Sequence, residues 1–301
     1  MTSAFVSAQS LDEALSALAA GARPVAGGTD LVVGARQGKK PLPESLVAIH
    51  RVEELRRMTS ADGRLCLGAL VTHEQIAADA VVCDQLTALA DASSIVGSHA
   101  TRAQGTVGGN VMNASPAMEL GGPLLVFGAT ATLRSASGER QVAVAELFTG
   151  PGATSAAADE LLTAVEIPFP PDGSGSCYAR LEYRRQMEIA VVGATASVAL
   201  AGGTVEQARV AITALAPTIR LVPESEQVLV GSDGGADAVL AAAQAAAAAS
   251  EPIGDVRASA EYRRAMAEVV ARRVLTAALA RARGEAIPVP ASSALFGAGP
   301  S

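Results

Sequence analysis

Aromatic residues are almost absent from this sequence. There is no tryptophan, and aromatic side chains make up only 3% of the 301 residues. The chain therefore lacks the stacking platforms of proteins that bind single-stranded nucleic acids and the aromatic belts of membrane proteins. Positive charge is also scarce, because 23 Lys and Arg stand against 30 Asp and Glu and give a net charge of −7. A field of this sign repels polyanions, so the composition argues against a nucleic-acid partner.

Cysteine is rare, and its positions follow no pattern. Cys66, Cys83 and Cys177 are odd in number and form no CxxC pair, so the sequence indicates neither a disulfide framework nor a cysteine metal site. The first residues have no basic segment before an apolar core, and acids follow at Asp12 and Glu13, unlike a secretory signal. These features predict reduced thiols in a cytoplasmic protein.

Long hydrophobic runs are missing as well. The longest uncharged stretch, residues 189–205, is short for a transmembrane helix and contains three glycines. It alternates small with β-branched residues, which favours strands over a helix. We therefore expect a β-hairpin with arms 189–200 and 207–215 and a turn at Gly202 and Gly203.

The common nucleotide-binding and catalytic motifs do not occur. No GxGxxG is found, and residues 34–40 lack the spacing and the Ser or Thr of a phosphate-binding P-loop. There is neither a GxSxG nucleophile elbow nor an HExxH zinc motif, and His50, His73 and His99 lie far apart. We expect no metal ligand and no catalytic side chain on this chain.

Half of the residues are hydrophobic, so the chain can bury a substantial core, and its length predicts two or three compact units. In the first part, a helix capped by Ser10 alternates with short strands, and further helices begin at Thr72. The expected strands are residues 45–52, 64–70, 124–135, 139–147 and 161–168. From about residue 174 the pattern changes to the hairpin and two long helices, one starting near Ala236 and one capped by Ser259.

Two glycine-rich loops are the candidate site. The first loop comprises Val25, Ala26, Gly27, Gly28, Thr29, Asp30 and Leu31. Glycines let the backbone reverse tightly, so that consecutive N–H groups point into one concavity and hold a diphosphate without cationic side chains. An ordinary turn has the same composition, and this loop alone does not decide between the two.

The second loop comprises Thr106, Val107, Gly108, Gly109 and Asn110, with Ser115 and Glu119 close behind. Its glycines permit close approach of the backbone, while its hydroxyl, amide and carboxylate groups match phosphate and the hydroxyls of a ribose or ribityl chain. The alternative is a plain connection between helix and strand, although so many small polar groups exceed what a turn needs. Together the loops predict a nucleotide cofactor more strongly than either loop alone.

Six segments of the sequence resemble one enzyme family. They are AGGTDL (26–31), ATRAQGTVGGNVMNASP (100–116), LLTAVEIPFP (161–170), YARLEYRRQMEIAVVGA (178–194), AITALAPT (211–218) and DVRASAEYRRAMAEVVARRVL (255–275). Together they resemble the FAD-binding medium subunit of the molybdenum hydroxylases, the group of xanthine dehydrogenase, aerobic carbon monoxide dehydrogenase and nicotinate or nicotine dehydrogenases. The resemblance covers about residues 5–283.

The resemblance implies an α+β fold. A two-subdomain FAD-binding fold of the vanillyl-alcohol-oxidase type would be followed by a C-terminal α+β domain with an antiparallel sheet and helices. The expected divisions are residues 1–57 and 58–170 for the FAD-binding subdomains, 171–284 for the C-terminal domain and 285–301 for a flexible tail.

The resemblance also implies roles for single residues. Residues 25–31 would wrap the FAD diphosphate through backbone amides, and residues 106–110 would contact the phosphates and the ribityl chain. Glu119 occupies a position where relatives commonly have an aspartate. Leu162 matches a leucine packed near the flavin.

Arg180 falls where the family often places a lysine near the isoalloxazine ring. A permanently charged guanidinium would favour the negatively charged reduced flavin. The alternative is that Arg180 is engaged by an acid such as Glu182.

The implied function is electron transfer within a larger enzyme. An iron–sulfur small subunit with 2Fe–2S clusters and a large subunit with the molybdenum cofactor would be the partners, in a dimer of heterotrimers. FAD on this chain would take electrons from the iron–sulfur subunit and pass them to an external acceptor. Two alternatives remain, namely a free-standing FAD-dependent oxidoreductase of the same flavin fold and a scaffold subunit without FAD.

Overall fold

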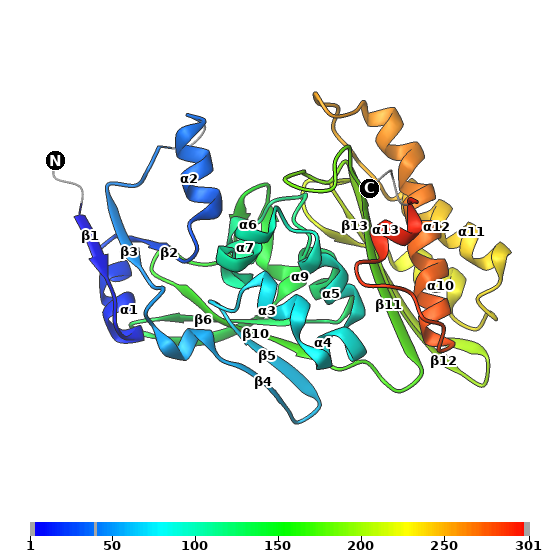
Figure 1. Ribbon diagram of the computed structural model, residues 1–301, viewed down its shortest axis with the longest axis horizontal. Helices are drawn as coiled ribbons and strands as arrows, with labels where there is room; N and C mark the ends of the chain where they lie inside the picture. The colour runs from blue at the N-terminus through cyan, green and yellow to red at the C-terminus, as the bar shows by residue number, and fades with distance from the viewer. Residues whose placement is uncertain (1–3, 39–40, 298–301) are drawn as a thin grey trace.

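The computed structural model describes residues 4–38 and 41–297, which form three β-sheets side by side with helices packed on them (Figure 1). The chain passes through the sheets in order, from the N-terminal sheet (blue) through the central sheet (cyan to green) to the C-terminal layer (green to red). The architecture is α+β, as the sequence predicted. In the described residues, no helix is long and apolar enough to cross a membrane.

The N-terminal sheet is small and parallel, in the order β1-β3-β2. Its elements are β1 (Ala4–Ser7), α1 (Leu11–Ala19), β2 (Arg23–Val25), α2 (Thr29–Arg36), β3 (Ser45–Ala48) and the 3-10 helix η1 (Glu53–Arg56). The predicted cap of α1 is confirmed, because the Ser10 side chain accepts a hydrogen bond from the Glu13 amide at 3.2 Å. Helix α2 begins inside the first glycine loop and buries none of its side chains.

The central sheet is antiparallel, in the order β4-β5-β10-β6-β7. Its strands are β4 (Met58–Ala61), β5 (Arg64–Gly68), β6 (Thr130–Ser135), β7 (Gly138–Ala143) and β10 (Leu161–Pro168), and a separate ribbon pairs β8 (Phe148–Gly150) with β9 (Ala153–Thr154). Its helices are α3 (His73–Ala78), α4 (Ala80–Gln85), α5 (Thr87–Ser94), α6 (His99–Gln104), α7 (Val107–Asn113), α8 (Gly121–Val126) and α9 (Val144–Leu147). The second glycine loop begins between α6 and α7.

Two predicted strands are wrong in part. The expected strand 139–147 ends at Ala143 with β7, and residues 144–147 form helix α9. Residues 124–135 were expected to form a single strand, but Leu124 to Val126 end helix α8, and β6 starts at Thr130 after a turn at Gly128. A short, fully buried apolar run has no periodicity that separates helix from strand. Helix α8 lies against the C-terminal sheet because Gly122 has no side chain, since a β-carbon there would stand 2.1 Å from Thr195 Oγ1.

The C-terminal sheet is antiparallel, in the order β11-β12-β13-β14. Its elements are β11 (Ser174–Leu181), β12 (Val192–Ala201), β13 (Thr204–Thr213), β14 (Arg220–Leu221), α10 (Pro223–Leu229), α11 (Ala236–Ala248), α12 (Ala260–Ala282) and α13 (Ala291–Leu295). The predicted hairpin is confirmed as β12–β13, with φ of 57° at Gly202 and 85° at Gly203 in its turn. The Ser259 side chain caps α12 as expected.

A buried ion pair joins the central and C-terminal layers. Asp91 on α5 accepts hydrogen bonds from both terminal nitrogens of Arg281 on α12, at 2.7 and 3.1 Å. Its Oδ1 also accepts from the Ala291 amide at 2.9 Å, which ties down α13. Residues 285–297 therefore differ from the flexible tail expected there, because they carry a helix whose first residue is fully buried. Residues 298–301 lie outside the described residues.

Each sheet has its own apolar core. The central core is continuous with the next layer, since Tyr178, Ala211 and Ile219 of the C-terminal region belong to it. The second glycine loop rests on this continuous interior through Val107, whereas Ala26 of the first loop packs on the N-terminal core.

Candidate functional site

The first glycine loop turns the chain from β2 into α2. Gly28 is the N-cap residue of α2 and has a left-handed conformation, with φ of 70°. Glycine adopts this conformation without steric cost. No side chain caps the helix. The N-terminal end of α2 is therefore a site where backbone donors and the helix dipole favour an anionic group.

Gly27 brings the first loop against the second. A β-carbon built on Gly27 would stand 1.8 Å from the carbonyl oxygen of Gln104 and 3.3 Å from the amide nitrogen of Gly105. Real β-carbons do not approach this closely, so only glycine fits at this position. Because Gln104 and Gly105 lead directly into Thr106, the two loops that the sequence singled out lie against each other.

The second loop starts helix α7 with a fixed backbone. Thr106 is the N-cap residue, and its Oγ1 accepts a hydrogen bond from the Gly109 amide at 3.1 Å. Gly108 lies on Ala69, because its amide donates to the Ala69 carbonyl at 2.9 Å and a β-carbon there would stand 2.7 Å from the same oxygen. These contacts attach the loop to the end of β5, so the loop is held before any ligand arrives.

Two groups of the second loop stay available for a ligand. A β-carbon on Gly109 would meet only Thr106 Oγ1, at 3.1 Å, and no other atom within 4 Å, so the backbone of Gly109 is open on that side. Asn110 Oδ1 is buried and has no hydrogen-bond partner among the described residues. A buried polar atom without a partner is costly, which makes Asn110 a candidate contact for a bound polar group.

Glu119, which follows the second loop, forms a buried ion pair with Arg180. Arg180 lies on β11 with its side chain fully buried, and its Nη1 donates to Glu119 Oε1. Its Nε donates to Glu182 Oε2 at 2.7 Å, and its Nη2 donates to the Ile95 carbonyl at 3.0 Å. Every nitrogen of the guanidinium is therefore engaged within the protein. The alternative considered from the sequence, that Glu182 engages Arg180, is confirmed.

The electrostatics of this pair follow from its burial. Burial raises the pKa of Glu119, and the positive charge of Arg180 opposes that rise. Burial acts to lower the pKa of Arg180, but the contributions of Glu119, Tyr178 and Glu182 together outweigh it and raise that pKa. Burial together with Glu119 also raises the pKa of Tyr178, which keeps this phenol neutral. Its hydroxyl is buried and has no partner among the described residues.

The predicted residues converge to different degrees. Asp30 of the first loop is close enough to Glu119 for its charge to raise the Glu119 pKa. Ser115 Oγ accepts from the Ala117 amide at 3.2 Å, which fixes the turn that leads to Glu119. Leu162 is 2% exposed and lies in the central core, at a β-bulge of β10. Leu162 is therefore a residue of the central core.

Several residues of the site were not anticipated from the sequence. His73, Gln104 and Gly105 support the second loop, and the Ile95 carbonyl holds Arg180. The only local signal was the capping pair Thr72 and Gln75, which fixes the start of α3. The other contacts join segments far apart in the chain, which a single sequence does not reveal.

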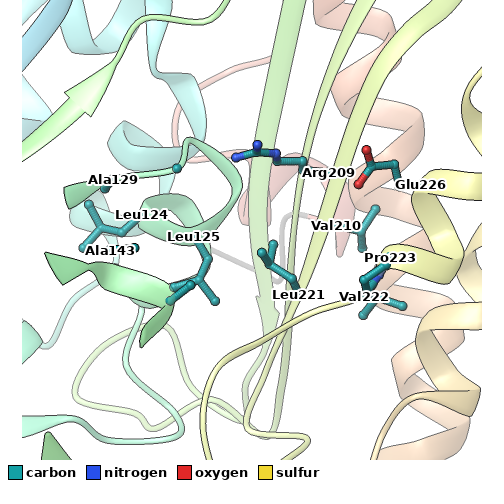
Figure 2. Close-up of a pocket in the computed structure, with 12 residues that line it drawn as sticks. Leu124, Leu125, Ala129, Ala143, Arg209, Val210, Leu221, Val222, Pro223 and Glu226 are labelled. Atoms are coloured by element: carbon teal, nitrogen blue, oxygen red, sulfur yellow. The ribbon is translucent and has the colours of Figure 1, made fainter. Parts of the chain in front are cut away.

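A separate cavity lies between the central and C-terminal sheets and contains none of the predicted residues. Its volume is about 280 Å³, and its walls are mostly apolar, with Leu124, Leu125 and Leu221 among them. Figure 2 shows the Arg209 side chain extended across it toward helix α8, with Glu226 on the other side. This cavity is distinct from the glycine loops.

Each half of the chain matches a known protein family. Residues 1–170 match the family described as the FAD binding domain in molybdopterin dehydrogenase, and residues 176–278 match the CO dehydrogenase flavoprotein C-terminal domain. The first of these ranges contains both glycine loops and Glu119. The second contains Arg180.

Relatives align over almost their whole length. The subunit alpha of the 6-hydroxypseudooxynicotine dehydrogenase complex of Paenarthrobacter nicotinovorans is 32% identical over 93% of this chain and 95% of its own. The carbon monoxide dehydrogenase medium chain of Afipia carboxidovorans is 31% identical over 89% of this chain and 93% of its own. The solved carbon monoxide dehydrogenase of Hydrogenophaga pseudoflava includes a chain that superposes with a TM-score of 0.89 at 29% identity, covering 92% of this chain and 97% of that one.

Proposed function

The chain belongs to the family of FAD-binding subunits of the molybdopterin dehydrogenases, and on that premise we propose that it transfers electrons within a molybdenum hydroxylase complex. It takes electrons from an iron–sulfur subunit and delivers them to an external acceptor. FAD, when bound, supplies the redox chemistry, since it accepts and releases two electrons. The observation that carries the proposal is the junction of Gly27 with Gln104, which unites both predicted cofactor loops inside the matched FAD-binding region.

The residues present fit a dinucleotide such as FAD. Gly28, at the uncapped start of α2, suits a diphosphate, which the helix dipole attracts. The open side of Gly109 leaves room for the backbone to approach the same group. The buried Asn110 Oδ1 needs a donor, and the hydroxyls of a ribityl chain or a ribose supply one. In this proposal residues 25–31 and 106–110 hold the cofactor mainly through the backbone.

Glu119 and Arg180 have different tasks in the proposed site. Glu119 is held by Arg180 and lies near Asp30, so it accepts a hydrogen bond from a cofactor hydroxyl while its own position stays fixed. The permanent charge of Arg180 offsets the negative charges of Glu119 and Glu182, so the buried cluster opposes the negative charge of the reduced cofactor less than the two carboxylates alone would. Leu162 and the surrounding core exclude water from beneath the loops.

The partner assignment rests on the relatives. One curated relative is a subunit of a dehydrogenase complex, and another is a medium chain of carbon monoxide dehydrogenase. We propose the same organisation here, with a 2Fe–2S small subunit and a large subunit with the molybdenum cofactor, as a dimer of heterotrimers. A cytoplasmic location is part of this proposal and agrees with the three free cysteines.

Two other functions are less well supported. A free-standing FAD oxidoreductase needs a substrate pocket beside the flavin, and the 280 Å³ cavity is lined by none of the predicted site residues. A scaffold subunit without FAD would not need the close fit of Gly27 on Gln104 or the open backbone at Gly109. The scaffold alternative is separated from the proposal by a redox experiment.

The test is reduction and reoxidation of the flavin-loaded chain. The purified protein is photoreduced without oxygen, and bleaching of flavin absorbance is followed. It is then mixed rapidly with NAD⁺, a soluble quinone, cytochrome c or oxygen. We expect complete reduction and fast reoxidation by one of these acceptors. A chain that binds flavin but reacts with none of them faster than free FAD does would contradict an electron-transfer role.

A further inference from the structure

His73 is a buried histidine that no part of the proposed redox chemistry uses. It is the first residue of α3 and is only 1% exposed. Its Nδ1 has no hydrogen-bond partner among the described residues. A buried histidine in a structural role normally bonds through its ring nitrogens. No hydrogen bond through Nδ1 in the described part of the chain explains why this ring is buried, so its role must be sought in the residues against which it packs.

The ring of His73 fills the space beside Gly105. A β-carbon on Gly105 would stand 3.2 Å from His73 Cδ2 and 3.6 Å from His73 Nε2, so the imidazole lies against the glycine backbone. The backbones are joined as well, because the His73 amide donates to the Gly105 carbonyl at 3.1 Å and the Val107 amide donates to the Val71 carbonyl at 2.9 Å. The start of α3 is thus a rigid support for the second loop.

The same short segment carries the first loop. Gly27 rests on the carbonyl of Gln104, the residue immediately before Gly105. The imidazole of His73 therefore lies beside Gly105, and Gly27 lies against the neighbouring Gln104, so both pack on the same peptide segment. A change in the size of the His73 side chain moves this peptide, and the movement reaches both loops.

We propose that His73 is a positioning residue that sets the spacing between the two cofactor loops through the Gln104–Gly105 peptide. This inference rests on the proposed FAD site. The ring acts by its volume, and it must be uncharged, because an imidazolium needs hydrogen-bond acceptors that the surroundings of Nδ1 do not offer.

The charges around His73 agree with a neutral ring. The titratable side chains on the helices packed against α3 are Cys83 and Asp84 on α4, Asp91 on α5, and His99 and Arg102 on α6. Burial first, and the positive charge of Arg102 second, lower the pKa of His73 to about 4. The Arg102 guanidinium is held by the Val96 carbonyl at 3.1 Å and by His99 Nδ1 at 3.0 Å, so its charge keeps a fixed position near the ring.

The test compares substitutions that separate ring volume from ring chemistry. In the full chain, His73→Phe keeps an aromatic ring that never titrates, His73→Ala removes the ring, and His50→Ala changes an exposed histidine as a control. FAD affinity is measured by quenching of flavin fluorescence between pH 3.5 and 8, and hydrogen exchange of residues 104–109 is measured without FAD. Melting curves of the cofactor-free proteins report whether each variant is folded.

We expect His73→Ala to weaken FAD binding at pH 7 by about tenfold or more, and His73→Phe to stay within about threefold of the unmodified chain, as expected when volume decides. Hydrogen exchange of residues 104–109 should be faster in His73→Ala alone. As the pH falls toward 4, where the buried ring begins to take up a proton, the unmodified chain should lose FAD affinity while His73→Phe keeps it. His50→Ala should match the unmodified chain throughout.

Two results would overturn the inference. Equal losses of affinity in His73→Phe and His73→Ala would show that ring volume is not what matters, and identical pH profiles for the unmodified chain and His73→Phe would remove the role of ring charge. If His73→Ala does not fold, the Phe variant and its pH profile still decide. An unmodified chain that binds no FAD contradicts the proposed function instead, and the hydrogen-exchange comparison then tests the support of the loop separately.

Discussion

Gly27 rests on the carbonyl oxygen of Gln104 so closely that a β-carbon on Gly27 would stand 1.8 Å from that oxygen. The two residues lie far apart in the sequence, yet this contact makes one site of two glycine loops. Each loop alone has the composition of an ordinary turn. Their contact explains why residue 27 must be glycine, because any side chain there would collide with Gln104.

Gly27→Ala should therefore remove the cofactor site. The added methyl group collides with a backbone oxygen that cannot rotate away, so the loops must separate, and overpacking of this kind costs about 1–3 kcal/mol. We expect the FAD content of the purified variant to fall about tenfold or more, measured by the ratio of flavin to protein absorbance. Gly150→Ala is the matched control, because no atom lies within 4 Å of its β-carbon position, and it should keep its FAD.

Arg180→Leu should both weaken the fold and shift the flavin potential. The substitution leaves Glu119 and Glu182 without their buried cation, and removal of one partner of such a pair costs about 3–5 kcal/mol. Loss of the positive charge also makes the reduced cofactor less favourable, so we expect a lower flavin midpoint potential in a dye-equilibration titration. A potential that stays the same or rises would be inconsistent with the assignment of Arg180.

A conservative variant separates these two effects. Arg180→Lys keeps the charge but loses the forked geometry that reaches Glu119, Glu182 and the Ile95 carbonyl at once. It should lower the free energy of unfolding while leaving the midpoint potential closer to that of the unmodified chain. If Leu and Lys shift the potential equally, charge is not the cause.

Asp91 and Arg281 should be coupled strongly in stability. Both side chains are nearly inaccessible, and Asp91 also accepts from the Tyr178 and Ala291 amides. Asp91→Asn and Arg281→Met should each lower the free energy of unfolding by about 3–5 kcal/mol, because each leaves a buried charge or donor unmatched. Chemical denaturation of the single and double variants measures the coupling, and the double variant should be less destabilised than the sum of the two.

An exposed pair is the control for that cycle. Arg64 and Glu166 are joined at 2.9 Å, but the Arg64 side chain is 56% exposed. Their removal should change stability little, since solvent screens exposed pairs. If the losses at Asp91 and Arg281 were additive, like those of the exposed pair, the buried ion pair would not be coupled as described.

Stability should fall in mildly acidic solution because of His73. Its pKa is lowered to about 4 in the folded chain, from an ordinary value of 6.5. As the pH falls below 6.5, the unfolded chain takes up a proton that the folded chain refuses until about pH 4. His73 therefore costs no stability above pH 6.5. Between pH 6.5 and pH 4 it lowers the free energy of unfolding by about 3 kcal/mol.

The measurement is the difference in unfolding free energy between the unmodified chain and His73→Phe across that pH range. The difference should favour His73→Phe increasingly as the pH falls, because phenylalanine does not titrate. The raised pKa values of Asp91 and Glu119 affect both proteins equally and cancel in the difference. A difference that is flat from pH 7 to pH 4 would mean that His73 titrates normally.

Much of the fold follows from local signals in the sequence. Ser10, Thr72 and Ser259 each cap the helix that follows them, and Gly202 with Gly203 makes the predicted hairpin turn. These features depend on residues at most a few positions apart, which a single sequence displays. The start of β6 was misplaced because the run from Leu124 to Val126 is buried on all sides, and burial removes the periodicity on which such predictions depend.

The site was harder to predict than the fold. Both glycine loops were identified from their composition, but the Gly27–Gln104 contact and the three partners of Arg180 depend on tertiary packing. His73 gave no signal, because a lone histidine in a sequence does not disclose whether its nitrogens find partners. The predicted tail around Ala291 has the composition of a loop, and only the buried Asp91 that it contacts explains its order.

The most direct test of this account is the flavin content of the chain purified alone, measured by acid release and identification of the cofactor. If the two loops form one FAD site, the released flavin is FAD, at close to one per chain, and it is lost in Gly27→Ala but kept in Gly150→Ala. A folded, colourless chain that takes up no added FAD would contradict the account.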